Sequence, residues 1–377
     1  INARSIPLAI ANLVSPGVNA SGTIDGEARI SGTPSSLAGD WNVKIGKLSD
    51  PSLRSSGLSS IDIAANGRLE GTSTSVNAQI NAGRAGTLNV TGRVPIDAAA
   101  RMDLNIRGAI DASAANTMLA ANGQSVTGKV NVDLRATGST SDPQVSGSAT
   151  LAGGTFADPL NGVRLENINA RLLGSGRDLN IEQLSATTPN GGTISGSGKI
   201  NLATAGFPGT IHITGRNAQV SSTQTVSSTA DFDLNITGTL GQRLKVAGKI
   251  TIVSMDVTVP ERLPINLRPL PNAKHIDPGP FVREILALEK KAKARAKAKS
   301  AFDAMLDIAV SAPNRLFVRG RGIDAEFGGD LRITGSVQKP NIIGQFDQRH
   351  GRISIAGKRI DITQGRLTFT GGLTPEI

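Results

Sequence analysis

Cysteine and tyrosine are absent from this chain of 377 residues, and aromatic residues are scarce. Trp41 is the only tryptophan, and Phe, Trp and Tyr together make up 3% of the sequence. The lack of cysteine excludes disulfide bonds and Cys-based zinc sites. Large rings carry much of the buried area of a compact core, so their scarcity argues against two or three ordinary globular domains.

Long apolar runs are also missing. No stretch of 18 apolar residues occurs, and the first residues do not have the pattern of a signal peptide. The chain starts at Ile1 without Met. We therefore expect a piece of a longer protein, with its targeting segment upstream.

Aliphatic residues at alternate positions are the main feature that is present, most clearly over residues 313–369. The alternating pairs are Leu331 and Ile333, Ile353 and Ile355, Ile360 and Ile362, and Leu367 and Phe369. A period of two gives each strand one apolar and one polar face. The chain also holds 44 glycines, which interrupt the pattern where a meandering sheet turns or bulges.

Similar segments recur upstream. Each consists of a strand pattern, a Gly-Ser or Gly-Thr step, a polar turn and a second strand, and the marker glycines are Gly32, Gly138, Gly238 and Gly335. These glycines lie 106, 100 and 97 residues apart, which favours a repeating architecture. Chance recurrence in a chain rich in Gly, Ser and Thr is the alternative.

The sheet that this pattern predicts is very long. About 25 strands spaced about 4.8 Å apart would extend on the order of 120 Å. Such a sheet must curl, because a flat one would expose a large apolar face. The residues therefore predict an all-β fold. Its aliphatic face would line an open groove in a long curled single sheet, or would be filled in a packed sandwich or β-solenoid, and the pattern alone leaves both open.

Two segments break the strand pattern. Residues 109–121 predict one short helix, capped by Asp111 or Ser113. Residues 278–304 predict an inserted helix rich in Lys and Ala, which separates a repetitive β segment (1–277) from a C-terminal β domain (305–377).

The predicted insertion is strongly basic. The chain has a net charge of +10, and residues 281–299 hold seven Lys or Arg against two Glu. This helix is interpreted as a solvated spacer or as a contact to an anionic membrane surface, whereas nucleic-acid binding would need interleaved aromatic residues. The expected headgroup contacts are Lys290, Lys291, Lys293, Arg295 and Lys297.

Patterns of catalytic or metal sites are lacking. The three histidines are far apart, and His212 lies between Ile211 and Ile213, on the polar side of a strand, where a solvated side chain is expected. No HExxH, Walker or G-x-S-x-G motif is present. We therefore expect no enzymatic activity, no cofactor and no metal.

Residues 310–377 carry a more specific signal. The motif V-R-G-R-G runs from Val318 to Gly322, Asp324-Ala325-Glu326 and Gly329-Asp330-Leu331 follow it, and GRISIAGKRIDITQGRLTF closes the segment. This stretch resembles the C-terminal domain of the TamB family, the inner-membrane-anchored subunit of the bacterial translocation and assembly module. The upstream residues resemble the family more diffusely.

The resemblance implies a β-taco, a groove-shaped sheet lined with aliphatic residues that spans the periplasm. It implies movement of phospholipid between the inner and outer membranes, and assembly of outer-membrane proteins with an Omp85-type (TamA-like) barrel partner. The N-terminal membrane anchor of the family is not among these residues, and the chain ends at Ile377, before the family's final strands. The Lys/Ala-rich helix has no counterpart in the family pattern.

The resulting expectation is a periplasmic, non-enzymatic conduit that holds phospholipid acyl chains and does not bind nucleic acid. The first alternative is a scaffold or chaperone that assembles outer-membrane or autotransporter proteins by β-augmentation. A surface adhesin or β-helix with a filled core is the second. The expected groove residues share the apolar phase of their strands: Val130, Val132, Leu134, Phe232, Leu234, Ile236, Val246, Ile250, Ile252, Leu331, Ile333, Ile342, Phe346, Ile353, Ile355, Ile360, Ile362, Leu367 and Phe369.

Overall fold

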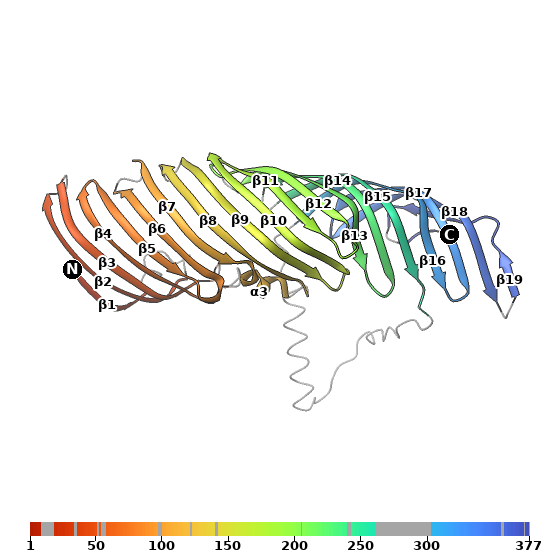
Figure 1. The fold of residues 1–377 in the computed structure, drawn as a ribbon, viewed down its shortest axis with the longest axis horizontal. Coiled ribbons are helices and arrows are strands. Elements are labelled where there is room, and N and C mark those ends of the chain that lie inside the picture. Colours follow the sequence, from red (N-terminus) through yellow and green to blue (C-terminus); the bar gives the residue numbers. More distant parts are fainter. Residues whose placement is uncertain are drawn as a thin grey trace, which may run out of the picture.

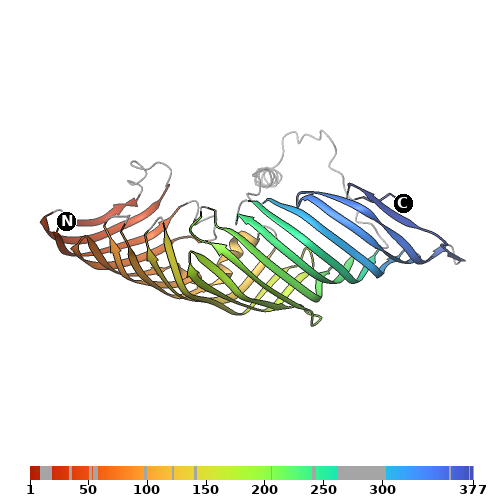
Figure 2. The same ribbon diagram turned by 90° about the horizontal axis from the view of Figure 1, so that it is seen from above.

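One 20-stranded sheet makes up most of the molecule. The computed structural model describes residues 1–8, 19–33, 36–50, 53, 58–96, 100–120, 123–139, 142–204, 206–239, 243–260, 303–355, 358–372 and 374–376. The strands follow one another along the long axis, and the two termini lie towards opposite ends of it (Figures 1 and 2). The sheet is curled and does not close on itself, so the prediction of an all-β fold with a single curled sheet is confirmed.

The strands are long and follow one another closely in the chain. The N-terminal fifteen are β1 (Asn2–Pro7), β2 (Ser21–Thr33), β3 (Ser36–Ser49), β4 (Ile61–Gly71), β5 (Ser73–Asn81), β6 (Gly86–Pro95), β7 (Met102–Asp111), β8 (Ser125–Gly138), β9 (Pro143–Asp158), β10 (Val163–Gly176), β11 (Asp178–Thr187), β12 (Thr193–Asn201), β13 (Pro208–Ser222), β14 (Val226–Thr239) and β15 (Arg243–Thr258). The C-terminal five are β16 (Asp303–Gly320), β17 (Ile323–Ser336), β18 (Lys339–Ile355), β19 (Lys358–Asp361) and β20 (Arg366–Thr370).

Strand order follows chain order, with one change of direction. Each strand from β1 to β15 pairs antiparallel with the next, as do β16, β17 and β18. β15 and β16 instead run parallel, from Arg243 opposite Asp303 to Thr258 opposite Arg319. Parallel neighbours need a long return connection, and residues 259–302 provide it. The far edge of β18 is shared by β19 and β20.

The described residues form 20 strands instead of the expected number of about 25, because single strands are longer than the sequence pattern suggested. β16 has 18 residues and β18 has 17. Bulges interrupt the alternation within these strands, as between Ala312 and Leu316, without ending the strand. The row from β1 to β18 therefore extends on the order of 80 Å at about 4.8 Å per strand, rather than 120 Å.

Glycines on the apolar face allow the sheet to curl. Gly92 and Gly248 have φ values of 147° and 149°, which L side chains rarely adopt. A Cβ at Gly92 would collide with the carbonyl oxygen of Asp103, and one at Gly248 with that of Asp233. Only glycine lets the neighbouring strand come this close, and such kinks are how a sheet acquires curvature.

The four marker glycines have one structural role but not one period. Gly32, Gly138, Gly238 and Gly335 all have positive φ and lie in the last two residues of a strand. Among the described strands, the first two intervals each advance six strands, from β2 to β8 and from β8 to β14. The third advances only three, to β17, because residues 259–302 take up the remaining length. The repeat is therefore structural over β2–β14 only.

The two predicted helical segments have different outcomes. In place of one helix over 109–121, β7 continues to Asp111 and is followed by η3 (Ala112–Ala115) and α3 (Asn116–Leu119). Asp111 caps this segment as expected, since its carboxylate accepts the Ser113 N–H at 2.8 Å. The predicted basic insertion lies almost entirely outside the described residues, so it and the domain division built on it stay predictions.

Candidate functional site: an open apolar trough

The apolar face of the sheet, here called the trough, is set by strand alternation and register. Neighbouring strands are aligned so that apolar residues lie opposite apolar residues or glycine. Ile211, Ile236, Val246 and Leu306 form one such row across β13 to β16. Because directly opposed residues point to the same side of a sheet, the trough continues from strand to strand.

The register places most of the expected groove residues on the trough. They are Val130, Val132, Leu134, Phe232, Leu234, Ile236, Val246, Ile250, Ile252, Leu331, Ile333, Ile342, Phe346, Ile353, Leu367 and Phe369. Ile360 lies opposite Ile353 and shares this face, but 52% of its side chain is exposed at the end of the sheet. Ile362 follows β19, and the side chain of Ile355 is outside the described residues.

Most trough side chains are half-buried. Val130, Leu234 and Ile236 touch neighbours in the sheet and still reach solvent. The buried hydrophobic residues in the described ranges are mostly alanines; the larger ones are Ile252, Ile308, Leu316 and Phe346. A two-layer sandwich would bury many large aliphatic side chains. The apolar face is therefore an open surface along most of its length.

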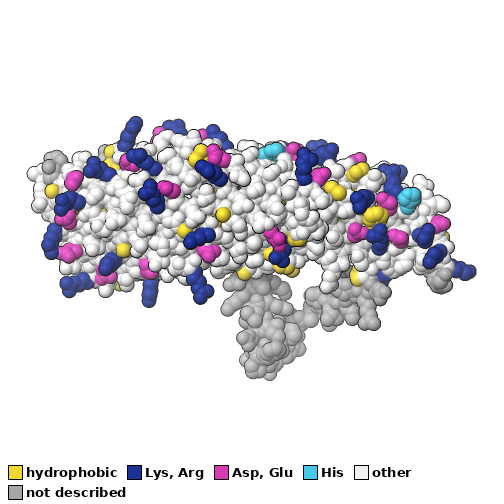
Figure 3. All heavy atoms as spheres, viewed as in Figure 1, with side chains coloured by type: hydrophobic (Ala, Val, Ile, Leu, Met, Phe, Trp, Pro, Cys, Tyr) yellow, Lys and Arg dark blue, Asp and Glu magenta, His cyan; other side chains and the backbone are white. Residues whose placement is uncertain are grey.

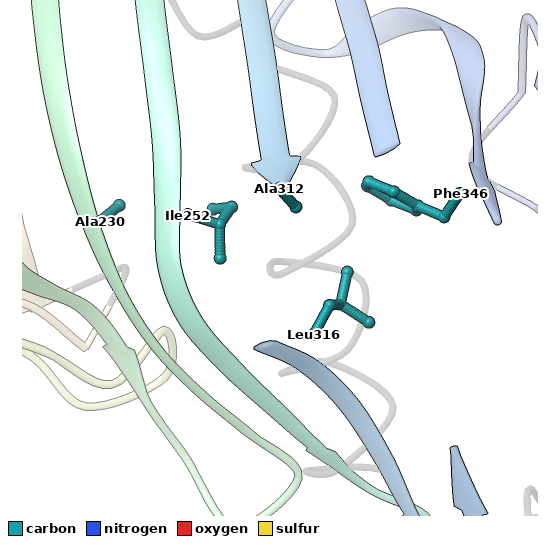
Figure 4. Packing of buried hydrophobic residues seen from close by; sticks show 5 residues of the cluster. All are labelled: Ala230, Ile252, Ala312, Leu316 and Phe346. Carbon is teal, nitrogen blue, oxygen red and sulfur yellow. The ribbon is translucent and has the colours of Figure 1, made fainter. Parts of the chain in front are cut away.

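The trough is filled by its own side chains at one place. Ala230, Ile252, Ala312, Leu316 and Phe346 form a buried cluster from β14, β15, β16 and β18 (Figure 4). The ring of Phe346 also meets the ring of Phe369 edge-on, with centroids 6.3 Å apart. Two of the expected groove residues, Ile252 and Phe346, thus make their main contacts with other side chains.

The opposite face of the sheet is polar. Figure 3 shows Lys and Arg side chains interspersed with Asp and Glu, with few hydrophobic side chains between them. Ion pairs connect neighbouring strands, such as Arg107 to Asp133 at 3.0 Å and Arg135 to Asp103 at 2.6 Å. The hydrogen bond from Arg135, together with its charge, holds the pKa of Asp103 below its usual value. This face is suited to water, whereas the trough is not.

Two outer-face contacts concern residues singled out in the sequence. His212 was expected to be solvated; it is exposed, but its Nε2 also lies 2.7 Å from Asp233 on the next strand. Sequence alternation placed both side chains on one face, but only the register brings them together. Arg319 pairs with Asp256 at 2.6 Å and Asp324 at 3.3 Å, so it stabilises the outer face of β15–β17.

Other candidate sites are not represented in the described part of the chain. Within it, no group of three or more His, Asp or Glu is arranged to hold a metal ion. None of its helices has the length and hydropathy needed to cross a membrane. The expected headgroup contacts Lys290, Lys291, Lys293, Arg295 and Lys297 lie outside the described ranges, so that prediction stays open.

Comparison with known families supplies the identification. The family model of the TamB C-terminal domain matches residues 182–376, from β11 to the last described residue. This is just over half of the chain.

The chain belongs to the TamB family. The match extends the resemblance seen over residues 310–377 upstream to β11. TamB proteins are non-enzymatic components of the outer-membrane assembly system of the bacterial cell envelope, where they work with an outer-membrane partner. No curated protein and no solved structure matches the chain.

Proposed function

We propose that the trough of this TamB-family chain carries phospholipid acyl chains across the periplasm, between the inner and outer membranes. One observation carries the proposal: a half-buried apolar face continues from strand to strand across β2–β18, with a polar face behind it. An acyl chain in the trough would remove apolar surface from water on both partners, at about 25 cal/mol per Å².

The dimensions support a row of lipids rather than a single binding site. The sheet extends on the order of 80 Å, whereas one leaflet of a bilayer has a hydrocarbon depth of about 15 Å, half of the usual 30 Å core. Because the sheet does not close, the headgroups can stay in water at the open seam while the chains lie against the apolar floor. The docking of one end to an Omp85-type barrel is part of the same proposal.

Photo-crosslinking can test the lipid path directly. A photoreactive side chain at Ile236 or Ile333, both on the trough, is expected to capture phospholipid in cells. The matched controls are their neighbours Asn235 and Arg332, which are exposed on the outer face. Equal capture from both faces, or none from the trough, would contradict the proposal.

The unclosed sheet also supports a second candidate function. Among the described strands, β1 pairs only with β2, so its other edge could accept a strand from an outer-membrane substrate by β-augmentation. This function predicts crosslinks from β1 to a nascent barrel protein, without lipid in the purified protein. Native mass spectrometry separates the two, because phospholipid that co-purifies with the protein is expected only for the conduit.

A further inference from the structure

Two cavities adjoin at the margin of the sheet, at the ends of β4 to β7. The first is apolar and has a volume of about 330 Å³. Its walls come from the sheet, chiefly Ile80, Leu88 and Ile110, and from the small side chains of Ala114 and Ala115 in η3. Figure 1 shows α3, which follows η3, at the lower margin of the sheet.

The apolar cavity is continuous with the trough. Ile80 lies opposite Leu88, and Ile110 lies opposite Val130, the first of the expected groove residues. These side chains therefore face the same side of the sheet as the rest of the trough. The cavity is a deeper section of the trough near its rim rather than a separate site.

The second cavity is polar, has a volume of about 570 Å³, and shares walls with the first. The residues that line both are Leu58, Ala82, Ala85 and Ala114. Its own lining offers hydroxyl and amide groups: Ser59, Ser60, Ser113, Asn116 and Thr117. A molecule that filled both cavities would need an apolar part and a strongly polar part.

One cation and one anion line the polar cavity, namely Arg84 and Asp62. Both are exposed, and neither makes an ion pair within the described ranges. Asp62 accepts the backbone N–H of Lys47 at 2.8 Å, which holds its carboxylate in place without neutralising its charge. The polar cavity thus presents one positive and one negative group that do not form an ion pair with each other.

Specific hydrogen bonds hold η3 and α3, whose residues line the cavities. Asp111 accepts the N–H of Ser113, and Asn116 accepts the N–H of Val126 through its side-chain oxygen at 2.7 Å. These bonds attach η3 and α3 to β7 and β8. These contacts favour a preformed cavity, which would lower the entropic cost of binding.

We propose that the two cavities together bind one zwitterionic glycerophospholipid, with an acyl chain in the apolar cavity and the headgroup in the polar one. The phosphate would accept hydrogen bonds from Arg84 and the hydroxyl groups, and the headgroup amine would lie at Asp62. An anionic headgroup without an amine would leave Asp62 uncompensated. This proposal rests on the proposed function of the trough and assigns to it a rim site that selects lipids by headgroup.

The test uses the whole chain with vesicles of equal parts phosphatidylethanolamine and phosphatidylglycerol. A photoreactive side chain at Leu88 is expected to capture phosphatidylethanolamine preferentially, and one at Asn89, exposed on the outer face, to capture none. Arg84→Gln and Asp62→Asn should each reduce capture at Leu88 about tenfold, the size of one charge-assisted hydrogen bond. Capture at Ile236, far along the trough, should not change.

The variants are chosen to keep the fold. Asn at position 62 can still accept the N–H of Lys47, so Asp62→Asn removes charge alone. The matched control is Lys44→Gln, which removes an exposed cation from β3 away from the cavities. An equal loss of capture with this control would overturn the proposal, since it would indicate non-specific attraction.

The remaining outcomes separate the rim site from the trough. Capture at Ile236 without capture at Leu88 would overturn the rim site and leave the proposed conduit standing. No capture at either position would contradict both. Equal capture of the two lipids at Leu88 would overturn the assignment of a zwitterionic headgroup.

Discussion

Gly248 lies on the trough face of β15, where the next strand approaches closely. Its φ of 149° and the nearby carbonyl oxygen of Asp233 leave no room for a side chain. We expect Gly248→Ala to destabilise β14 and β15 by about 1–3 kcal/mol, because the backbone must shift to admit the methyl group. Hydrogen exchange of the amides in β14 and β15 measures this locally, which matters in a sheet that need not unfold in one step.

Gly153→Ala is the matched control for this substitution. Gly153 also has a positive φ, 64°, but an added Cβ would meet no atom within 4 Å. Gly153→Ala should therefore cost only the unfavourable left-handed backbone conformation of alanine, about 1 kcal/mol. If Gly248→Ala and Gly153→Ala raised the rates of amide hydrogen exchange equally, the close approach of strands would not be the reason for glycine at position 248.

The sequence predicted on which face of the sheet a side chain lies. It did not predict which side chain of a neighbouring strand it contacts. Alternation assigned Ile236 to the trough and Asn235 to the outer face, because side chains alternate along a strand wherever no bulge interrupts it. The contact of His212 with Asp233 depends on register, which the sequence of one strand does not contain. The sequence did not indicate the proposed rim site for the same reason, since Arg84 and Asp62 line one cavity only because the fold brings the ends of β4 to β7 together.

At the scale of elements, charge pairs between neighbouring strands predict how stability depends on pH. Hydrogen bonds from Arg135, Arg177 and Arg366 lower the pKa values of Asp103, Asp142 and Asp347. A lowered folded-state pKa stabilises the fold above the unfolded value of about 4, and this contribution disappears as pH falls through the folded value. Unfolding followed by circular dichroism should thus be insensitive to pH between about 8 and 5 and easier below about 4.

Asp103→Asn is the control variant for this dependence of stability on pH. The variant should be less stable than the parent at pH 7, and the difference should vanish once the carboxyl is protonated in the parent. The effect should be small and should shrink in high salt, because the pair is exposed. A main transition near pH 6.5 would instead point to a histidine and contradict the role given to the carboxylates.

The sequence predicted where strands occur. It did not predict how long they are, or that one pair of neighbouring strands is parallel. The alternating pairs Leu331 and Ile333, and Leu367 and Phe369, lie in β17 and β20. Bulges extend β16 and β18 across positions where the pattern lapses, so the described part of the chain has fewer strands than expected. The parallel pairing of β15 with β16 had no local signal, because the alternation within each strand does not fix the direction of its neighbour.

At the scale of the whole molecule, the trough is one continuous apolar surface, and each strand contributes a part of it. Where a large residue lies on one strand, glycine often lies opposite, as Gly248 does to Leu234 and Gly344 to Leu331. Because a glycine lies opposite a large residue, the apolar surface stays level although the sheet is curled. A conduit along such a floor can be interrupted at a single strand, because a lipid passing from one end to the other must cross all of them.

Leu234→Asp tests that continuity. The carboxylate would stand in the middle of the trough on a side chain too short to reach past the rim, and Leu234 is only half-buried, so the fold should survive with a loss of about 1–2 kcal/mol. In cells, photo-crosslinking at Leu134 and at Ile333, on either side of the block, should keep lipid on the supply side and lose it on the other. Asn235→Asp places the same charge one residue away on the outer face and should change neither position. Unaltered capture on both sides of Leu234→Asp, with the fold intact by circular dichroism, would mean that lipids do not travel the trough end to end.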